Sequence, residues 1–474
     1  MQSDVFTKTN FDQLLQAQRV TARRWKSSTA KERQQRLKSS GDWIIKNQTL
    51  IQDAIWADFR KPSVEVDLSE IFPVTSEINH TIKNLTRWMK PKKVSMPMSM
   101  FATSGYIQLE PKGCALIISP WNYPFNLAIG PLISALAAGC PAILKPSELT
   151  PQTSGLIAQM ISELFRPEEV TVCQGDASVS QALLSLPFDH IFFTGSPEIG
   201  KVVMEKAAKN LSSVTLELGG KSPTIVTETA DVADAAKKIA FGKFVNSGQT
   251  CIAPDYILVH EDMKTELIAE LVLAIRDMYD PKHVGIKKSP DLARIVDQRH
   301  FERLSRYFQD AAEKGAKLEF GGNFIKQDLF IEPTLVSQIT EDMEIAQEEI
   351  FGPILPILTY RSIGEAIDYI NNKPKPLALY IFDSSGETTE VLEKTSSGNA
   401  VINDCVLHFL HNNLPFGGVG NSGLGKSHGY FGFLAFSHEK GVLKQRVGLN
   451  NATLLRPPYG LRAKQIIKSL IKWF

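Results

Sequence analysis

Cysteine is scarce in this chain of 474 residues. Its 5 cysteines are odd in number and no two of them have the CxxC spacing; they are Cys114, Cys140, Cys173, Cys251 and Cys405. A disulfide framework or a structural zinc site needs paired or clustered cysteines, so both are excluded. The 9 histidines are scattered without ligand spacing, and we expect no metal site. These absences are typical of a protein from a reducing compartment.

An excess of either charge is also missing, since Lys and Arg total 52 and Asp and Glu total 51, a net charge of +1. The broad basic surface that binds a phosphate backbone is therefore excluded, and we expect no nucleic acid partner. The first residues lack the basic head and continuous apolar stretch of a signal peptide, which predicts a cytoplasmic location. The hydrophobic share of 43% and charged share of 22% are those of a globular protein, and the length predicts about three domains or subdomains.

Residues 113–144 carry no charge and are long enough to suggest a membrane span. Prolines at four positions argue against that reading, because in lipid they would leave backbone groups unpaired. We predict instead a buried strand at Ala115–Ile118, a buried helix at about 127–138 and a second strand at Ala142–Leu144. The same segment therefore reads as one strand–helix–strand unit of a globular core.

The alternation of strands and helices continues along the chain. Helices are predicted near 151–165 and 197–209, and strands at Val170–Cys173, His190–Phe193 and Thr224–Val226. After Cys251 a second series of strands and helices reads in the same way, at Tyr256–His260, Leu267–Asp277, Phe301–Lys314, Glu332–Leu335 and Ile363–Asn371. Strands joined by single helices form parallel sheets with both faces covered. The predicted fold is α/β, with two doubly wound parallel-sheet lobes.

The C-terminal segment differs from the rest, since residues 454–474 hold five basic residues and no acid. Its apolar residues fall on one helical face, comprising Ile466, Ile467, Leu470, Ile471 and Phe474, and its lysines on another, comprising Lys464, Lys468 and Lys472. Such a basic amphipathic helix either packs on the body or a second subunit, or makes peripheral contact with the cytoplasmic face of a membrane. It is too short and too charged to span a bilayer.

Seven short motifs carry the chemical information. They are Trp121–Pro124, Lys145–Glu148, Phe193–Gly200, Glu217–Pro223, Gly248–Cys251, Glu348–Pro353 and Pro415–Gly420. In this order they resemble the aldehyde dehydrogenase superfamily from about residue 10 to residue 445, and the run 408–429 looks most like the class 3 and fatty aldehyde dehydrogenase branch. The resemblance implies a Rossmann-like NAD(P)-binding domain at 1–85 and 107–216, a catalytic domain at 217–400, a small β oligomerisation arm at 86–106 and 401–450, a tail at 451–474, and a homodimer.

The resemblance also assigns the catalytic roles. Cys251 is the nucleophile, Glu217 the general base and Asn122 the oxyanion donor, so that an aldehyde passes through a thiohemiacetal and a thioester to a carboxylic acid. The residues fit these roles chemically: a partly desolvated carboxylate can take a proton from water near pH 7, and an uncharged amide suits a developing alkoxide. Cys251 follows a helix predicted at Asp231–Asn246, whose C-terminal dipole disfavours a thiolate, so other groups must activate it.

Cofactor binding does not use the usual GxGxxG turn, and the match at Gly418–Gly423 lacks a preceding strand. The turn at Gly195–Gly200 instead joins a strand to a helix whose free N–H groups can face a pyrophosphate. The residues assigned to cofactor binding are Trp121, Lys145, Ser147, Glu148, Gly195, Ser196, Gly200, Leu218, Glu349 and Phe351. By resemblance, Lys145 and Glu148 reach the adenosine ribose. A carboxylate there favours NAD, with NADP tolerated.

Substrate choice is less legible. Five residues are candidates for an apolar funnel towards Cys251, namely Tyr123, Phe125, Ile402, His408 and Phe409, although aromatic and aliphatic residues are by default core. We expect an apolar aldehyde of medium to long chain, or one derived from lipid. The alternatives are a CoA-acylating or semialdehyde dehydrogenase of the same fold, a thiol hydrolase with a histidine base, and a non-catalytic membrane-associated relative.

Overall fold

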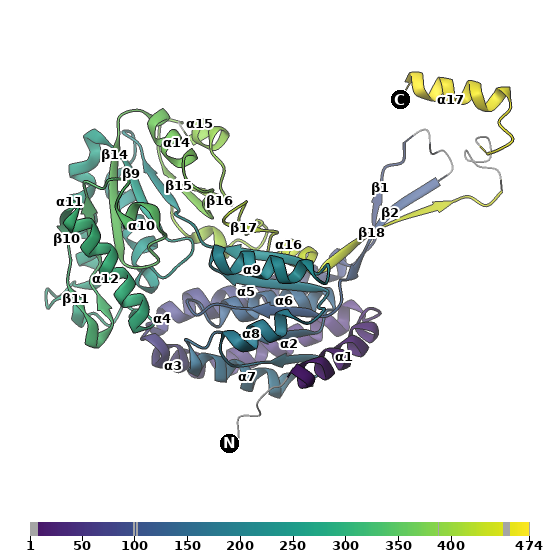
Figure 1. Ribbon diagram of the computed structural model, residues 1–474, viewed down its shortest axis with the longest axis horizontal. Helices are drawn as coiled ribbons and strands as arrows, with labels where there is room; N and C mark the ends of the chain where they lie inside the picture. The colour runs from purple at the N-terminus through teal and green to yellow at the C-terminus, as the bar shows by residue number, and fades with distance from the viewer. Residues whose placement is uncertain (1–7, 98–99, 101–102, 387, 449–455, 474) are drawn as a thin grey trace.

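A computed structural model describes residues 8–97, 100, 103–386, 388–448 and 456–473. Two α/β lobes lie side by side, and a narrow antiparallel arm projects from the first of them (Figure 1). The predicted fold class is confirmed, since each lobe is built on one largely parallel sheet with helices on both faces.

The chain begins with a helical layer that the sequence patterns did not reveal. Its members are α1 (Lys8–Trp25), α2 (Ala30–Lys46), α3 (Gln48–Phe59), α4 (Ser63–Val66), the π-helical turn η1 (Asp67–Ile71) and α5 (Phe72–Trp88). Helix α2 starts at a capping box, in which the Thr29 side chain accepts from the Glu32 N–H and the Glu32 carboxylate accepts from the Thr29 N–H. The π-helical turn is wound one residue wider than an α-helix, a form that frequently occurs at functional sites.

The first lobe contains a six-stranded sheet. Its strands, in spatial order, are β17 (Gly423–Leu424), β7 (Ser213–Leu218), β6 (His190–Gly195), β3 (Ala115–Ile118), β4 (Ala142–Lys145) and β5 (Val170–Val172). Its helices are α6 (Asn126–Ala138), α7 (Pro151–Leu164), α8 (Ala177–Leu184), α9 (Pro197–Ala208) and α16 (Gly429–Ala435). Alternate residues of β3 enter different cores, Ile117 with α5 and α6 and Leu116 with α8 and α9. The uncharged segment is therefore a buried strand–helix–strand unit, and among the helices of the described residues none has the length and apolar character of a bilayer span.

The second lobe contains a seven-stranded sheet in which only β10 is antiparallel. The order is β10 (Lys317–Phe320), β13 (Thr334–Ser337), β14 (Ile354–Tyr360), β9 (Tyr256–His260), β8 (Pro223–Val226), β15 (Ala378–Phe382) and β16 (Asn399–Ile402). Its helices are α10 (Val232–Phe244), α11 (Lys264–Tyr279), α12 (Gln298–Glu313), α13 (Glu344–Gln347), α14 (Ile363–Asn371) and α15 (Thr388–Lys394), and β11 (Phe324–Ile325) pairs with β12 (Phe330–Ile331). The strand predicted at Glu332–Leu335 starts later, because Pro333 has no N–H and the ladder begins at Thr334.

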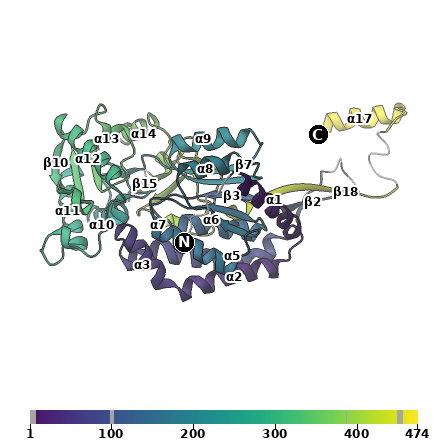
Figure 2. The same ribbon diagram turned by 60° about the horizontal axis from the view of Figure 1, so that its bottom comes forward.

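The arm is a three-stranded antiparallel sheet of β1 (Lys92–Val94), β2 (Thr103–Pro111) and β18 (Ser437–Gln445). In both views it projects beyond the body, and α17 (Leu461–Trp473) lies beyond the arm, apart from both lobes (Figures 1 and 2). Helix α17 is amphipathic as predicted, with Ile466 and Leu470 half-buried and its lysines exposed. Of the predicted tail, residues 451–455 and Phe474 lie outside the described residues, as do residues 1–7 at the other end and 449–450 of the arm.

A buried ion pair anchors the N-terminal helices to the first sheet. The Lys61 ammonium lies 3.0 Å from Glu70 Oε1, and both side chains are fully buried. Glu70 Oε2 accepts the backbone N–H groups of Phe125 and Asn126 at the start of α6. Lys61 Nζ also lies 3.8 Å from the centroid of the Tyr123 ring. The pair thus fixes the turn that follows β3 against η1.

Replacing Lys61 by Met should lower the free energy of unfolding by about 3 kcal/mol, because the buried Glu70 carboxyl would lose the cation that pairs with it. Urea denaturation followed by tryptophan fluorescence measures the change. The matched control is Lys38→Met, which breaks an exposed pair with Asp42 and should change stability by less than about 1 kcal/mol. Equal midpoints for the two variants would contradict a stabilising role for the buried pair.

Candidate active site

The first sheet reverses its winding direction between β3 and β6, because β4 and β5 lie on one side of β3 and β6 and β7 on the other. Crevices at such reversal points, at the carboxyl ends of the strands, are the usual ligand sites of open α/β sheets. Here the segments that leave the two strands, Pro120–Asn122 and Gly195–Glu198, line one open cavity. We call it the polar cavity.

A loop of unusual backbone conformation carries Cys251. Helix α10 begins as predicted, with Asp231 capping the Asp234 N–H, but it ends at Phe244 and not at 246. The reason is that Asn246 and Ser247 have φ of 55° and 52°, in the left-handed region, where a helix cannot continue. Gly248 follows at φ 73°, and a Cβ there would lie 2.3 Å from the Gly352 carbonyl oxygen. We call residues 246–251 the nucleophile loop.

Hydrogen bonds from both lobes hold this strained loop. The Asn246 N–H donates to Glu65 Oε1 at 2.8 Å, and its side-chain amide donates to the Asn122 carbonyl at 2.8 Å. From the second lobe, the Ala293 carbonyl accepts from Ser247 Oγ at 2.7 Å.

The Gln249 side chain makes further hydrogen bonds that attach the nucleophile loop to the second lobe. Its side-chain amide donates to the carbonyls of Asn246 and Arg294, both at 3.0 Å, and its Oε1 accepts the Val296 N–H at 3.0 Å. A side chain with all its hydrogen-bonding groups engaged in a buried site is rigid, so the backbone leading to Cys251 is fixed. Sequence reasoning missed the role of Gln249, because its partners in the second lobe, Arg294 and Val296, are 45 and 47 positions away.

Cys251 is partly exposed at the end of the loop. Burial of the sulfur raises the pKa of the Cys251 thiol far above its usual range, and the nearby Glu349 and Glu217 carboxylates raise it further. The N–H groups of Cys251 and Ile252 act in the opposite direction. In this environment Cys251 is a thiol and not a thiolate. Its conversion to the reactive thiolate needs a positive charge from a group other than helix α10.

Glu217 is the penultimate residue of β7, where it is paired with Gly423 of β17 and almost completely buried. Burial raises the pKa of Glu217 to about 7, although a hydrogen bond from Ser427 and the Lys426 charge lower it. The Ser427 hydroxyl donates to Glu217 Oε1. A carboxylate with a pKa near neutrality is suited to take a proton from water.

Asn122 lies in the turn after β3, and its side chain is buried. Its Nδ2 donates one hydrogen bond to the Gln249 carbonyl at 3.0 Å, which fixes the amide against the nucleophile loop. An amide NH₂ group has two hydrogens, so one N–H remains for an oxyanion. Asn122, Glu217 and Cys251, which the sequence assigned to catalysis, all line the polar cavity.

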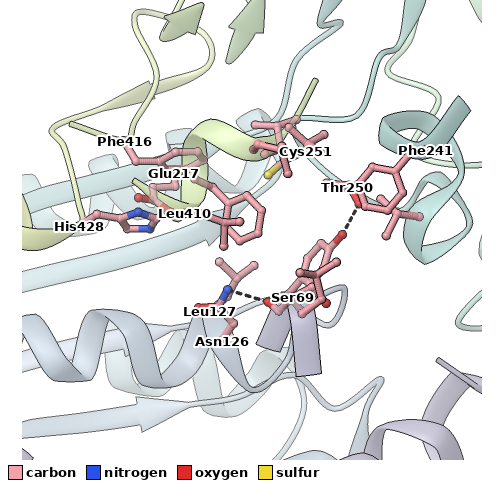
Figure 3. A pocket seen from close by; sticks show the side chains of 17 residues that line it. Ser69, Asn126, Leu127, Glu217, Phe241, Thr250, Cys251, Leu410, Phe416 and His428 are labelled. Carbon is pink, nitrogen blue, oxygen red and sulfur yellow. Dashed lines mark hydrogen bonds between the residues drawn. The ribbon is translucent and has the colours of Figure 1, made fainter. Parts of the chain in front are cut away.

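A second cavity approaches Cys251 from another direction. It is mostly apolar, has a volume of about 770 Å³, and is lined by Leu68, Ser69, Tyr123, Asn126, Leu127, Glu217, Phe241, Val245, Thr250, Cys251, Ile252, Val406, Leu407, Phe409, Leu410, Phe416 and His428. Figure 3 shows Cys251 and Glu217 facing it, with Phe416 and His428 beside Glu217. We call it the apolar cavity. Cys251 and Glu217 line both cavities, so the two spaces meet at the predicted catalytic pair.

Two of the five predicted funnel residues line the apolar cavity, Tyr123 and Phe409. The other three do not: Phe125 is buried in the core of the first lobe, Ile402 is 48% exposed at the end of β16, and His408 stacks on Phe416. The residues that sequence reasoning missed come largely from η1, α6, α10 and the 3-10 turn η7 (Leu407–Leu410). They carried no motif, because an apolar cavity wall has the same composition as a core.

The polar cavity, of about 1300 Å³, contains six of the ten residues assigned to the cofactor, namely Trp121, Gly195, Ser196, Leu218, Glu349 and Phe351. The N-terminus of α9 opens into it, which suits a pyrophosphate, and the partly buried Glu349 carboxyl suits a ribose hydroxyl. The residues present therefore fit a nicotinamide dinucleotide.

The remaining four do not line the cavity: Lys145, Ser147, Glu148 and Gly200. Lys145 pairs with Glu148 at 2.9 Å. Gly200 instead allows close packing of α9 on β7, since a Cβ there would lie 2.7 Å from Leu218 Cδ2.

The loop with Glu349 and Phe351 is clamped from behind. The Arg303 guanidinium donates to the Ile350 carbonyl at 2.8 Å and to the Phe351 carbonyl at 3.3 Å. Phe351 itself has φ 47°, and its ring meets Trp121 edge-on with centroids 5.3 Å apart. Arg303, which sequence reasoning did not find, thus holds an aromatic pair at the wall of the polar cavity.

Comparisons with known proteins agree with this arrangement. A sequence model of the aldehyde dehydrogenase family matches residues 2–442. The 4,4'-diaponeurosporen-aldehyde dehydrogenase of Staphylococcus aureus is 45% identical over 435 residues, which are 92% of this chain and 93% of that protein. Aldehyde dehydrogenase family 3 member B1 of Bos taurus is 42% identical over 442 residues, 92% of each protein. A solved structure of Staphylococcus aureus AldH in its substrate-bound state has a TM-score of 0.92 and 42% identity, covering 97% of this chain and 99% of that chain.

The family that the motifs predicted is thereby confirmed, together with relatives in its family 3 branch. The chain belongs to the aldehyde dehydrogenase family and is an oxidoreductase that acts on aldehydes with a nicotinamide cofactor.

Proposed function

We propose that the protein oxidises apolar aldehydes, of medium to long chain or derived from lipid, to carboxylic acids, with Cys251 as the covalent nucleophile. The observation that carries this proposal is the meeting of an apolar and a polar cavity at Cys251 and Glu217. An aldehyde tail enters through the apolar cavity while the cofactor occupies the polar one. Leu68 and Leu407, at 40% and 41% exposure, extend the apolar lining towards solvent.

In the first half of the mechanism the Cys251 thiol loses its proton to water, and the resulting thiolate sulfur adds to the aldehyde carbon. The rigid nucleophile loop holds the sulfur in place, so little orientation is lost on reaching the transition state. The carbonyl oxygen becomes an oxyanion, which the free N–H of Asn122 and the Cys251 backbone N–H stabilise. When bound, the cofactor supplies a positively charged ring that accepts hydride, and the thiohemiacetal becomes a thioester.

The second half is hydrolysis of the thioester. Glu217 takes a proton from a water molecule, whose oxygen attacks the acyl carbon, and the carbon–sulfur bond then breaks to release the carboxylic acid. The raised pKa of Glu217 permits this proton transfer near neutral pH. Ser427 orients the carboxylate by donating a hydrogen bond to it.

We infer NAD as the preferred cofactor, with NADP tolerated. The support is Glu148, a half-exposed carboxylate just after the carboxyl end of β4 and outside the lining of the polar cavity. There it would repel a 2′-phosphate, while its partner Lys145 would attract one.

The apolar cavity also bears on the alternatives. None of its lining residues among the described part of the chain is Lys or Arg, so a semialdehyde's distal carboxylate has no cation there. A CoA-acylating reaction would not need Glu217 as base. Membership in the aldehyde dehydrogenase family argues against the last two alternatives, a non-redox thiol hydrolase and a non-catalytic relative.

We propose in addition a homodimer joined through the arm. The arm has two edge strands, β1 and β18, and exposes Leu443 at 55% and Val94 at 41%. A projecting sheet that buries little against its own chain is best explained by a partner that covers it. For α17 we propose peripheral contact with the cytoplasmic face of an anionic membrane, supported by its exposed lysines and by Ile471, which is 78% exposed.

Turnover should be detectable as reduced-cofactor absorbance with both hexanal and a long-chain aldehyde, with the higher kcat/KM for the longer chain because it fills more of the apolar cavity. Cys251→Ser should abolish this signal yet bind the cofactor with an affinity within about threefold, since the sulfur is not needed for binding. Binding is measured by quenching of tryptophan fluorescence. An inactive wild-type protein that binds cofactor, or an active serine variant, would contradict the proposal.

The rate of thioester hydrolysis should rise with pH through about 7, because Glu217 acts as base only after losing its proton. Steady-state kcat between about pH 6 and 9 measures this rise under conditions where hydrolysis limits turnover. Glu217→Gln should lower kcat by about 100-fold or more and remove this part of the profile, while any titration of Cys251 persists. A wild-type profile identical in shape to that of the variant would refute the role of Glu217.

Deleting residues 454–474 should reduce co-sedimentation with anionic vesicles, since five basic residues are lost with the apolar face. Neutral vesicles are the control, and they should retain little of either protein. An unchanged pellet fraction would show instead that the helix packs on the body or on a second subunit.

A further inference from the structure

A third, smaller cavity adjoins Glu217. Its polar lining includes Glu77 of α5, Asn126 and Ser134 of α6, and Ser427 and His428, which directly precede α16. Its volume is about 470 Å³, smaller than the about 770 Å³ of the apolar cavity and the about 1300 Å³ of the polar cavity, and it has room for water molecules. We call it the water cavity. Glu217 lines it as well as the two larger cavities.

Glu77 on α5 is the second carboxyl group of the water cavity and is only 6% exposed. Its Oε1 accepts the Gly429 N–H at 2.7 Å, but its Oε2 is buried without a hydrogen-bond partner. A buried carboxyl oxygen without a partner is costly unless water or a proton satisfies it. The water cavity thus has a carboxyl group with an unsatisfied oxygen at one wall and the predicted base at another.

No charged group among the described residues contributes to the shift in the pKa of Glu77. Desolvation raises the pKa of Glu77 to about 7, and only the Gly429 N–H acts against it. The His428 imidazole has a pKa lowered to about 4 by burial and is neutral near pH 7. His80, one turn along α5, also has its pKa lowered by burial, which disfavours a positive charge on its ring. The Lys426 charge lowers the pKa of Glu217 and is not among the causes that shift the pKa of Glu77. Glu77 is therefore not one half of a structural ion pair.

We infer that Glu77 receives the proton that Glu217 takes from the hydrolytic water, through water in the water cavity. In this step the O–H bond of protonated Glu217 breaks and a bond forms to a cavity water, while that water gives one of its own protons to Glu77 Oε2. One proton moves and no electron is transferred. Glu217 is returned to its ionised form, and Glu77 then releases the proton to bulk water before the next turnover. The inference rests on the proposed hydrolytic half-reaction.

The other two cavities are poorer outlets for this proton. The apolar cavity offers few groups that hold a chain of waters, and in turnover it contains the acyl group. The polar cavity is the proposed place of the cofactor. The water cavity combines contact with Glu217, room for water and a second carboxyl group, and in the proposed reaction it holds neither the acyl group nor the cofactor. Glu77 acts through Glu217 and does not touch the substrate.

Glu77→Gln tests the inference, since it keeps an acceptor for the Gly429 N–H and removes the ionisable group. We expect hydride transfer in a single turnover, followed as reduced-cofactor absorbance, to stay within about twofold of wild type. Steady-state kcat should fall about tenfold or more, so that a burst of one reduced cofactor per site precedes slow turnover. Glu77→Asp should recover part of kcat. The matched control is Glu163→Gln, a surface carboxyl that accepts from Trp43 Nε1, which should leave both rates unchanged.

An unchanged steady-state rate in Glu77→Gln, in conditions where hydrolysis limits turnover, would overturn the inference. Equal losses of single-turnover and steady-state rates, with a lowered melting temperature, would also overturn it, because Glu77 would then only support the fold. Failure of the proposed function looks different, since wild type itself would form no reduced cofactor with either aldehyde.

Discussion

The nucleophile loop depends on a backbone conformation that its sequence alone would not adopt. Asn246 and Ser247 both lie in the left-handed region, at a cost of about 1–2 kcal/mol for each such residue. That cost is offset by hydrogen bonds that the loop donates to Glu65 and Asn122 of the first lobe and to the Ala293 carbonyl of the second. Because the contacts come from both lobes, Cys251 has a fixed position only when the lobes are packed together.

The same burial that fixes the loop sets the chemistry of the groups around it. Desolvation raises the pKa of Glu217 to about 7 and that of Glu349 to about 8, and it keeps Cys251 protonated. Two carboxyl groups with pKa values near neutrality can gain and lose protons readily at physiological pH. The thiol beside them needs a nearby positive charge before it can ionise. Each of the three carboxyl or thiol groups faces the polar cavity, so cofactor binding would act on all of them at once.

Much of the fold could be predicted from the sequence because its strands are short apolar runs between helices. Helix α14 begins and ends at the residues expected, and β3 does likewise. The motifs also named Asn122, Glu217 and Cys251, which the structure brings to one cavity. Local patterns carry such information when the residue type itself is chemically unusual for its position.

What could not be predicted depends on long-range packing. The predicted end of α10, at Asn246, is two residues beyond the observed end at Phe244. The left-handed turn that ends the helix is held by partners far along the chain. Ser427, 210 positions from Glu217, has no local signal that marks it as a hydrogen-bond donor to the base. Phe125 and Ile402 appeared equivalent to Tyr123 and Phe409 in sequence, yet only the latter two reach the apolar cavity.

The central claim is that one sulfur atom carries the acyl group between oxidation and release. Acid quenching of the enzyme during turnover with a long-chain aldehyde, followed by peptide mass spectrometry, locates that group directly. The account predicts an added acyl mass on the peptide that contains Cys251 and on no peptide with another of the 5 cysteines. An acyl group found on a different residue, or no adduct in an enzyme that is turning over and limited by hydrolysis, would contradict it.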